Sequence, residues 1–408
     1  MNKLFAKAHV WLSIPFGIIL TIVCLTGAIL VFETEIQELR YPSRYFVKEV
    51  KGTPLPPAAL MEAARQQLPD SIQLNGIRVS SDPKRTYQLV LPGKKAACFI
   101  DPYTAEITGI DDGKGFFITV MRLHRWLLGE YKRDGSFSWG KTIVGYSTLA
   151  LVFILISGLV IWFPRNKNML KNRLKIKTGA GGFRFLYDLH VSGGFYAALF
   201  LLALSLTGLT WSFGWYRNAF YTLFGVQADQ PQAHVEAAAP SSRTSGEKGS
   251  HRSSGSHEHS GSHEHSGSSE RNGKRQRKTA YAQWAEVLSD LQSRYPEYQS
   301  ITIQNGTATV STASYGNTRG SDRYSFDPET GKITDVQLYK DLPDSSKIRG
   351  WIYSVHTGTW GGMTTRILSC LASLLGAVFS LTGYYFWIRK KLRKRMNRND
   401  STDKTKRP

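Results

Sequence analysis

The chain has 408 residues, a net charge of +21 at pH 7 and 41% hydrophobic residues, averages that would suit two or three soluble domains. The apolar residues are not spread evenly, however. Four segments, at 8–32, 142–163, 189–216 and 364–388, are almost free of charged residues, and each is long enough to cross a hydrocarbon core about 30 Å thick. This pattern excludes a purely soluble enzyme and predicts a multi-pass α-helical membrane protein.

Basic residues gather beside the ends of these segments. The loop at 164–188 and the tail at 389–408 are rich in lysine and arginine, and two lysines lie within residues 1–7. Positive flanks of this kind mark the cytoplasmic side of a bacterial inner membrane. We therefore expect these three stretches to be cytoplasmic and residues 33–141 and 217–363 to be periplasmic. We attribute the excess of positive charge to the orientation of the chain in the membrane, and no nucleic-acid partner is expected.

The two outer regions are each predicted to be a small α+β domain. Residues 57–67 and 279–295 have helical patterns, and short strand-like runs follow each of them. An Asp-Pro-x-Thr sequence begins at Asp101 in the first region and at Asp327 in the second, which predicts a turn between two strands.

A stretch at 237–278 in the second outer region is rich in serine, glycine and histidine. Such a composition cannot bury a core, so the stretch is predicted to be disordered. It contains the sequence Ser-Gly-Ser-His-Glu-His twice, and its paired histidines are weak candidate ligands for zinc, copper or nickel: His257, His259, His263 and His265. A solvated linker with no specific ligand is the alternative.

The chain repeats its own pattern. His9 precedes the glycine of a Leu-Thr-Gly motif, Gly27, by 18 residues, and His190 precedes Gly208 of a second such motif by the same 18. The second apolar segment of each half carries Ser-Gly or Thr-Gly, at Gly158 and Gly383. The sequence therefore predicts four transmembrane helices in two parallel pseudo-symmetric repeats, each with an outer α+β domain.

Four histidines occupy matching places in the two halves. His9 and His190 begin the first apolar segment of each half, and His124 and His356 precede the second. Histidine at membrane depth is costly without a partner, and neutral imidazole is a good axial ligand of haem iron. We predict two haem b groups, one held by His9 and His190 near the cytoplasmic face and one by His124 and His356 near the periplasmic face. The loops that carry the latter two must fold back to the membrane.

Two further sets of residues have competing interpretations. Seven glycines either let a macrocycle approach the backbone or serve ordinary helix packing: Gly27, Gly158, Gly193, Gly194, Gly208, Gly376 and Gly383. Four basic residues are candidate partners of haem propionates or merely set the topology: Lys7, Arg125, Arg184 and Arg366.

The Leu-Thr-Gly motifs, the Leu-His-Arg-Trp sequence at 123–126, the Asp-Pro-x-Thr turns and the four-segment layout resemble the PepSY-associated transmembrane family. The resemblance covers nearly the whole chain except the histidine-rich stretch. It implies PepSY-like outer domains and a di-haem inner-membrane protein that reduces ferric iron held by a siderophore in the periplasm. The family's haem ligands would fall on His9, His124, His190 and His356.

The sequence carries no nucleotide-binding or flavin-binding motif, so the electron donor is expected to be external: a quinol, a flavoprotein or a soluble reductant. Two other functions stay open at this point. One is a non-redox membrane sensor whose outer domains bind a peptidase or a peptidoglycan factor. The other is a metal-handling membrane protein that uses the histidine-rich loop.

Overall fold

The computed structural model describes residues 2–92, 96–129, 136–164, 166–227 and 281–404. Four helical runs within them are long and apolar enough to cross a membrane. They are α1 (Asn2–Val31), α6 (Trp139–Trp162), α14 (Gly362–Lys404), and α8 (Gly182–Asp188) continued by a π-helical turn (Leu189–Gly193) and α9 (Gly194–Ser212). Helices α1 and α9 each pack against both α6 and α14, which makes a bundle. The predicted multi-pass membrane protein with four apolar helices is confirmed.

The outer segments form one continuous antiparallel sheet in the order β4-β3-β2-β1-β5-β6-β7-β8. The strands are β1 (Gly76–Ser80), β2 (Tyr87–Val90), β3 (Ala97–Ile100), β4 (Ile107–Asp111), β5 (Tyr298–Gln304), β6 (Thr307–Thr312), β7 (Ser321–Phe326) and β8 (Ile333–Gln337). Two separate domains were expected, but β1 pairs with β5 from Gly76–Gln304 to Ser80–Ser300. Each of these strands would otherwise be an edge with unpaired backbone groups, so the two halves close each other's open edge.

The two predicted Asp-Pro turns each lead into a further strand, for which the sequence analysis gave no range. Asp101 ends β3 and accepts hydrogen bonds from the backbone N–H groups of Tyr103 and Thr104, at 2.8 and 3.3 Å. Asp327 makes the same two bonds after β7, with the same distances. The strands that these turns begin, β4 and β8, are the two edges of the sheet and hold no fully buried residue, so their apolar alternation was weak.

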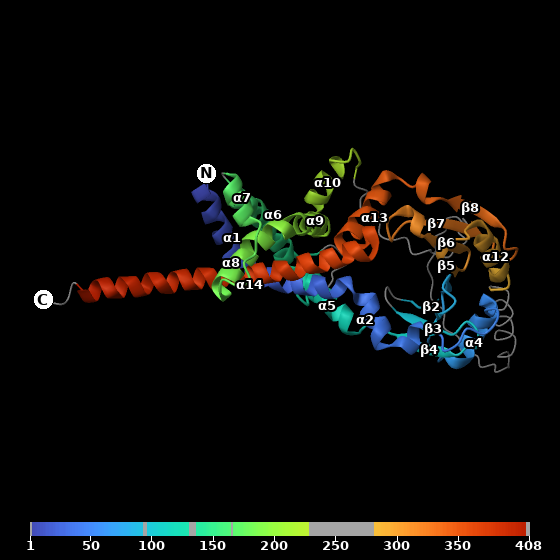
Figure 1. Ribbon diagram of the computed structural model, residues 1–408. Coiled ribbons are helices and arrows are strands. Elements are labelled where there is room, and N and C mark those ends of the chain that lie inside the picture. The colour runs from blue at the N-terminus through green and yellow to red at the C-terminus, as the bar shows by residue number, and fades with distance from the viewer. Residues whose placement is uncertain (1, 93–95, 130–135, 165, 228–280, 405–408) are drawn as a thin grey trace, which may run out of the picture.

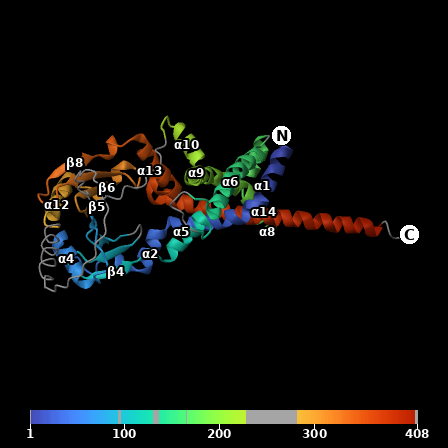
Figure 2. The same ribbon diagram turned by 180° about the vertical axis from the view of Figure 1, so that it is seen from behind.

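Helices α4 (Pro57–Gln67) and α12 (Trp284–Arg294) cover one face of the sheet and enclose the outer core. Leu60 and Trp284 of these helices are fully buried against Ile77 and Ile303 of the central strands. Figures 1 and 2 place α4 and α12 at the end of the molecule farthest from the membrane helices. The other face of the sheet therefore points toward the membrane helices.

Shorter helices lie at the two ends of the bundle. They are α2 (Glu33–Arg40), α3 (Pro42–Tyr45), α5 (Phe116–Trp126), α7 (Lys167–Arg173), α10 (Gly214–Thr222) and α13 (Asp344–Thr357). Short 3₁₀ turns lie at Ala313–Tyr315, Tyr339–Asp341 and Thr359–Gly361. Edge strand β4 leads into α5, and edge strand β8 leads into α13. Both edges of the sheet are thus tied to helices that return to the membrane.

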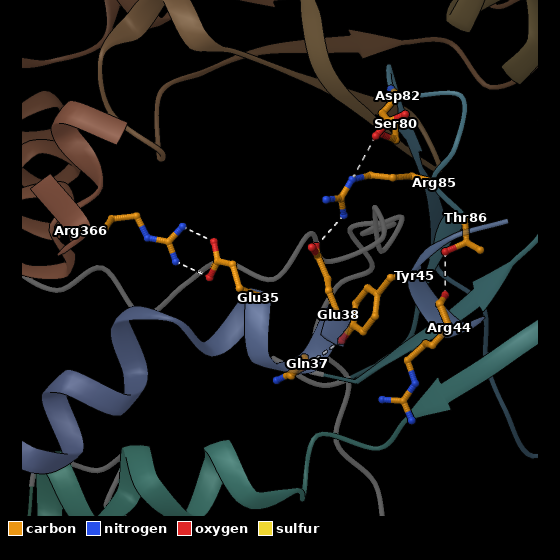
Figure 3. Close-up of polar contacts among 10 residues, drawn as sticks. All are labelled: Glu35, Gln37, Glu38, Arg44, Tyr45, Ser80, Asp82, Arg85, Thr86 and Arg366. Carbon is orange, nitrogen blue, oxygen red and sulfur yellow. Dashed lines mark hydrogen bonds and ion pairs between the residues drawn. The ribbon is translucent and has the colours of Figure 1, made fainter. Parts of the chain in front are cut away.

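Two ion pairs fasten α2 between the bundle and the sheet (Figure 3). Both guanidinium ends of Arg366 on α14 bind the carboxylate of Glu35, and their hydrogen bonds lower the pKa of that carboxyl group. The carboxylate of Glu38 accepts a 2.7 Å bond from Arg85 beside the sheet. Such contacts resist rotation of the sheet relative to the helices.

A buried carboxylate organises the second half of the sheet. Asp322 on β7 is 2% exposed. It accepts hydrogen bonds from the hydroxyls of Tyr295 and Tyr315, at 2.5 and 2.6 Å, and from the backbone N–H of Tyr339, at 2.6 Å. Burial and these contacts with Asp322 raise the pKa of both phenols, so they remain donors at neutral pH.

We expect Asp322→Ala to destabilise the protein by about 3 kcal/mol or more, because three donors lose their acceptor in a buried place. The matched control is Asp335→Ala, since Asp335 is exposed on edge strand β8. Thermal unfolding of the full-length protein in detergent measures both. Equal unfolding temperatures for the two variants would contradict the structural role given to Asp322.

Candidate functional site: two pairs of histidines

The first pair of histidines lies at the end of the bundle away from the sheet, and we call it the distal pair. His9 belongs to α1 and His190 to the π-helical turn before α9. Their ring centres are 6.4 Å apart and their planes are nearly perpendicular, at 78°. Single π-helical turns are common at functional positions. No pattern in the sequence predicted this one. The rings of Phe379 and Phe386 flank His190 at 5.7 and 5.8 Å.

The second pair lies between the bundle and the sheet, and we call it the sheet-side pair. His124 is on α5 and His356 is on α13, with ring centres 6.2 Å apart and planes at 55°. The segments that carry them were expected to be loops, but both are helices. They pack against α1 and α9, respectively. Trp211 of α9 adds an edge contact to His356, at 5.0 Å between ring centres.

All four imidazoles are held in the same way at Nδ1. For three of them, Nδ1 contacts a hydroxyl of a membrane helix and donates to the carbonyl three residues before it. These contacts join His9 to Ser157 and Ile154, His124 to Thr26 and Val23, and His356 to Thr207 and Leu204, all at 2.9–3.1 Å. His190 contacts the hydroxyl of Thr382 at 2.8 Å.

A glycine follows each of these hydroxyl residues and makes room for the ring. A Cβ atom on Gly27, Gly158 or Gly208 would lie 3.0–3.3 Å from Cε1 of His124, His9 or His356, respectively, and one on Gly383 would lie 4.0 Å from Cε1 of His190. The close approach that the sequence suggested at these four positions is therefore made by imidazole. Of the other three glycines, Gly376 packs against Cys24 and Leu201, Gly193 against Leu189 and Phe379, and Gly194 has open space.

These contacts decide what the rings can do chemically. A backbone carbonyl only accepts, so Nδ1 carries the proton at the three histidines that contact one. The hydroxyl of Thr382 donates to the carbonyl of Val378, so it accepts from Nδ1 of His190 as well. Nε2 is then left with its lone pair, and no hydrogen bond to Nε2 is found within the described ranges. A histidine whose Nδ1–H donates to a carbonyl or hydroxyl while Nε2 keeps its lone pair is typical of metal-bound histidine.

The distance between the two rings of each pair suits one metal ion bound by both imidazoles. A metal–imidazole nitrogen bond is about 2.0 Å long, and the ring centre lies a further ~1.1 Å away, so two imidazoles on opposite sides of one metal have centres ~6 Å apart. The measured 6.4 and 6.2 Å agree with this value. The residues of both pairs therefore fit a bis-histidine metal centre.

Two of the predicted propionate partners already have carboxylates of their own. Arg184 pairs with the buried Asp188 at 2.9 Å, and Arg366 pairs with Glu35. Arg125 lies beside His124 and stacks over Trp126 at 4.7 Å. The propionate role of these residues stays a prediction.

A cationic cluster beside the sheet-side pair was missed by the sequence analysis. Lys141 of α6 lies close enough to Arg125 of α5 and Arg217 of α10 to be repelled by both. The Nε atom of Arg217 is buried, and no hydrogen-bond partner is found for it in the part of the chain that the structure describes. The three residues are far apart in sequence, so no local pattern could have predicted that they meet.

The histidine-rich stretch, with His257, His259, His263 and His265, lies outside the described residues. Within those that are described, no group of three or more histidine, cysteine, aspartate or glutamate side chains could hold a metal ion. The two pairs are therefore the metal-ligand candidates that the structure offers.

The fold and the site define a multi-pass membrane protein with an extramembrane antiparallel sheet and two half-buried imidazole pairs. A family model, described as the PepSY-associated TM region, matches residues 6–390. The chain thus belongs to the PepSY-associated transmembrane family. No curated protein matches it.

Proposed function

We propose that the protein is a di-haem transmembrane electron-transfer protein that reduces ferric iron bound to a siderophore. The observation that carries this proposal is the meeting of two imidazoles from opposite halves of the chain, twice, at 6.4 and 6.2 Å between ring centres. His9 and His190 would hold one haem b group, and His124 and His356 the other. Haem iron carries one electron by alternating between Fe³⁺ and Fe²⁺.

The cationic cluster supports a haem at the sheet-side pair. Haem propionates are anions, and a buried guanidinium nitrogen without a partner is costly. Lys141, Arg125 and Arg217 together offer several donors beside His124. Arg217, whose buried Nε atom has no hydrogen-bond partner within the described residues, is a better candidate to bind a propionate than Arg184 and Arg366, which have carboxylate partners.

The placement of charge supports a direction for electron transfer. Basic residues of α7 and of the α14 tail lie at the end of the bundle away from the sheet, which favours a cytoplasmic position for that end in a bacterial inner membrane. The distal pair would take electrons from a quinol or a flavoprotein there. The sheet-side pair would deliver them in the periplasm, where reduction weakens the hold of an oxygen-rich chelator on iron.

The absorption spectrum of the purified full-length protein tests the proposal. We expect two haem groups per chain, and the spectrum of six-coordinate low-spin haem with two imidazole ligands, before and after addition of dithionite. A protein purified from haem-replete cells with no haem absorbance would overturn the proposal. The non-redox sensor would then be the better interpretation, since it requires no cofactor at the histidines.

A further inference from the structure

The sheet face that points toward the membrane helices is polar across the four neighbouring strands β1, β5, β6 and β7, whereas Phe99 continues the same register on β3. Side chains of the central strands alternate, so that Ile77, Val79 and Ile303 face α4 and α12, while the residues between them face the other way. The strand register places one row across this second face: Gln88, Arg78, Thr302, Thr309, Arg323 and Gln337. We call it the cross-sheet row.

The cross-sheet row carries two positive charges and no negative one. Arg78 on β1 donates from Nε to the hydroxyl of Thr302 at 3.1 Å. Over residues 2–92 and 281–404, neither Arg78 nor Arg323 has a carboxylate within 4.0 Å. Arg78 and Arg323 are both exposed on this face, so an anion from solvent can reach their guanidinium groups. The nearest acid on this face in the strand register, Asp335, is on edge strand β8.

The sheet face that carries the row points toward the end of the bundle at which α5 and α13, the helices of the sheet-side pair, lie. The two edge strands, β4 and β8, lead directly into the helices that carry His124 and His356, and both views show the sheet between α4 and α12 on one side and the membrane helices on the other (Figures 1 and 2). A third guanidinium contacts the helix of His356, since Arg319 stacks over Tyr353 of α13 at 3.9 Å.

The spacing of the charges fits a compact ligand. Arg78 and Arg323 are separated by three strand-to-strand steps, through β5 and β6, which is about 14 Å. Hydroxyls of Thr302 and Thr309 fill the space between them. A polar sheet face open to water is common, but such faces normally mix both signs of charge. Two guanidinium groups that have no carboxylate partner among the described residues and that flank hydroxyls are complementary to a rounded anion.

We propose that the cross-sheet row binds a negatively charged ferric chelate of the siderophore type, with Arg78 and Arg323 as the residues that select for anions. The proposal rests on the proposed function for the identity of the ligand as an iron chelate. It adds that the protein prefers anionic chelates to neutral ones, and that they bind on the sheet face nearest the sheet-side pair.

The test uses gallium(III) chelates, which match the shape of the iron(III) chelates but do not undergo reduction. Binding of the trianionic gallium tris-catecholate to the full-length protein is measured by calorimetry, with the neutral gallium tris-hydroxamate as the second probe. We expect Arg78→Gln and Arg323→Gln each to weaken tris-catecholate binding about tenfold, since each removes a charge-assisted contact. Arg78→Lys and Arg323→Lys should weaken it less.

The matched control is Lys332→Gln, which removes one positive charge from the turn beside Gly331, on the side of the sheet where α12 packs. It should bind the tris-catecholate as the native protein does. The proposal is overturned if the two arginine variants bind like the control, or if the neutral chelate binds as tightly as the anionic one. Because gallium is not reduced, binding can succeed while the haem spectrum fails, so the two proposals fail separately.

Discussion

Replacing His190 with alanine is expected to remove one of two haem groups and leave the other, so that haem absorbance per chain falls by about half. The reason is that His190 is half of the distal pair, whereas the sheet-side pair is held by α5 and α13. His9→Ala should give the same loss. The double variant should lose no more than either single variant, because two ligands of one metal act as a unit. Pairing His190→Ala with His124→Ala should remove both haem groups.

The pattern of losses separates ligation from general damage to the fold. His251→Ala is the matched control, since His251 belongs to neither pair, and it should retain both haem groups. The remaining haem in His190→Ala should keep the electron paramagnetic resonance signal of a bis-imidazole centre. Full haem content in His190→Ala, or a double His9 and His190 variant that loses far more than each single variant, would contradict the assigned pairs.

The membrane helices and the candidate ligands could be predicted because their signals are local. An uncharged run of more than 20 residues admits few structures other than a spanning helix. The duplication made His9 correspond to His190 and His124 to His356, which suggested which rings meet. In the structure, the ring centres of each expected pair lie 6.4 and 6.2 Å apart.

What could not be predicted depends on contacts between distant residues. The pairing of β1 with β5 joins residues more than 200 positions apart, and only the folded chain shows that each half closes the other's edge. The meeting of Lys141 with Arg217 is of the same kind. The π-helical turn at His190 has no composition of its own, because such a turn differs from an α-helix by one residue in register.

The glycines show how a correct signal can have a different cause. Gly27, Gly158 and Gly208 were noticed because small residues allow close approach, and packing of helices or of a macrocycle was expected. The structure instead sets an imidazole against each of them. A hydroxyl residue followed by glycine is therefore a combined signal: the first side chain orients the ring, and the second leaves space for it.

This interpretation makes a sharp prediction for Gly208→Ala. The added Cβ would lie 3.0 Å from Cε1 of His356, closer than ordinary contact, so the ring must shift. Because alanine favours a helix over glycine by about 1 kcal/mol, the substitution should leave α9 as stable as before or more so. We therefore expect the sheet-side haem to be weakened or lost while the unfolding temperature of the haem-free protein does not fall.

Gly194→Ala on the same helix is the matched control. A Cβ at Gly194 meets no heavy atom within 4 Å, so this variant gains the same helix propensity without touching a ligand, and both haem groups should remain. Haem content and thermal unfolding, measured on the two variants side by side, separate the effects. If Gly208→Ala kept both haem groups, with the absorbance of the native protein, then the imidazole of His356 would not need the space that glycine leaves. The role given to the four hydroxyl–glycine pairs would then fail, although the histidine pairs themselves would still stand on the result for His190→Ala.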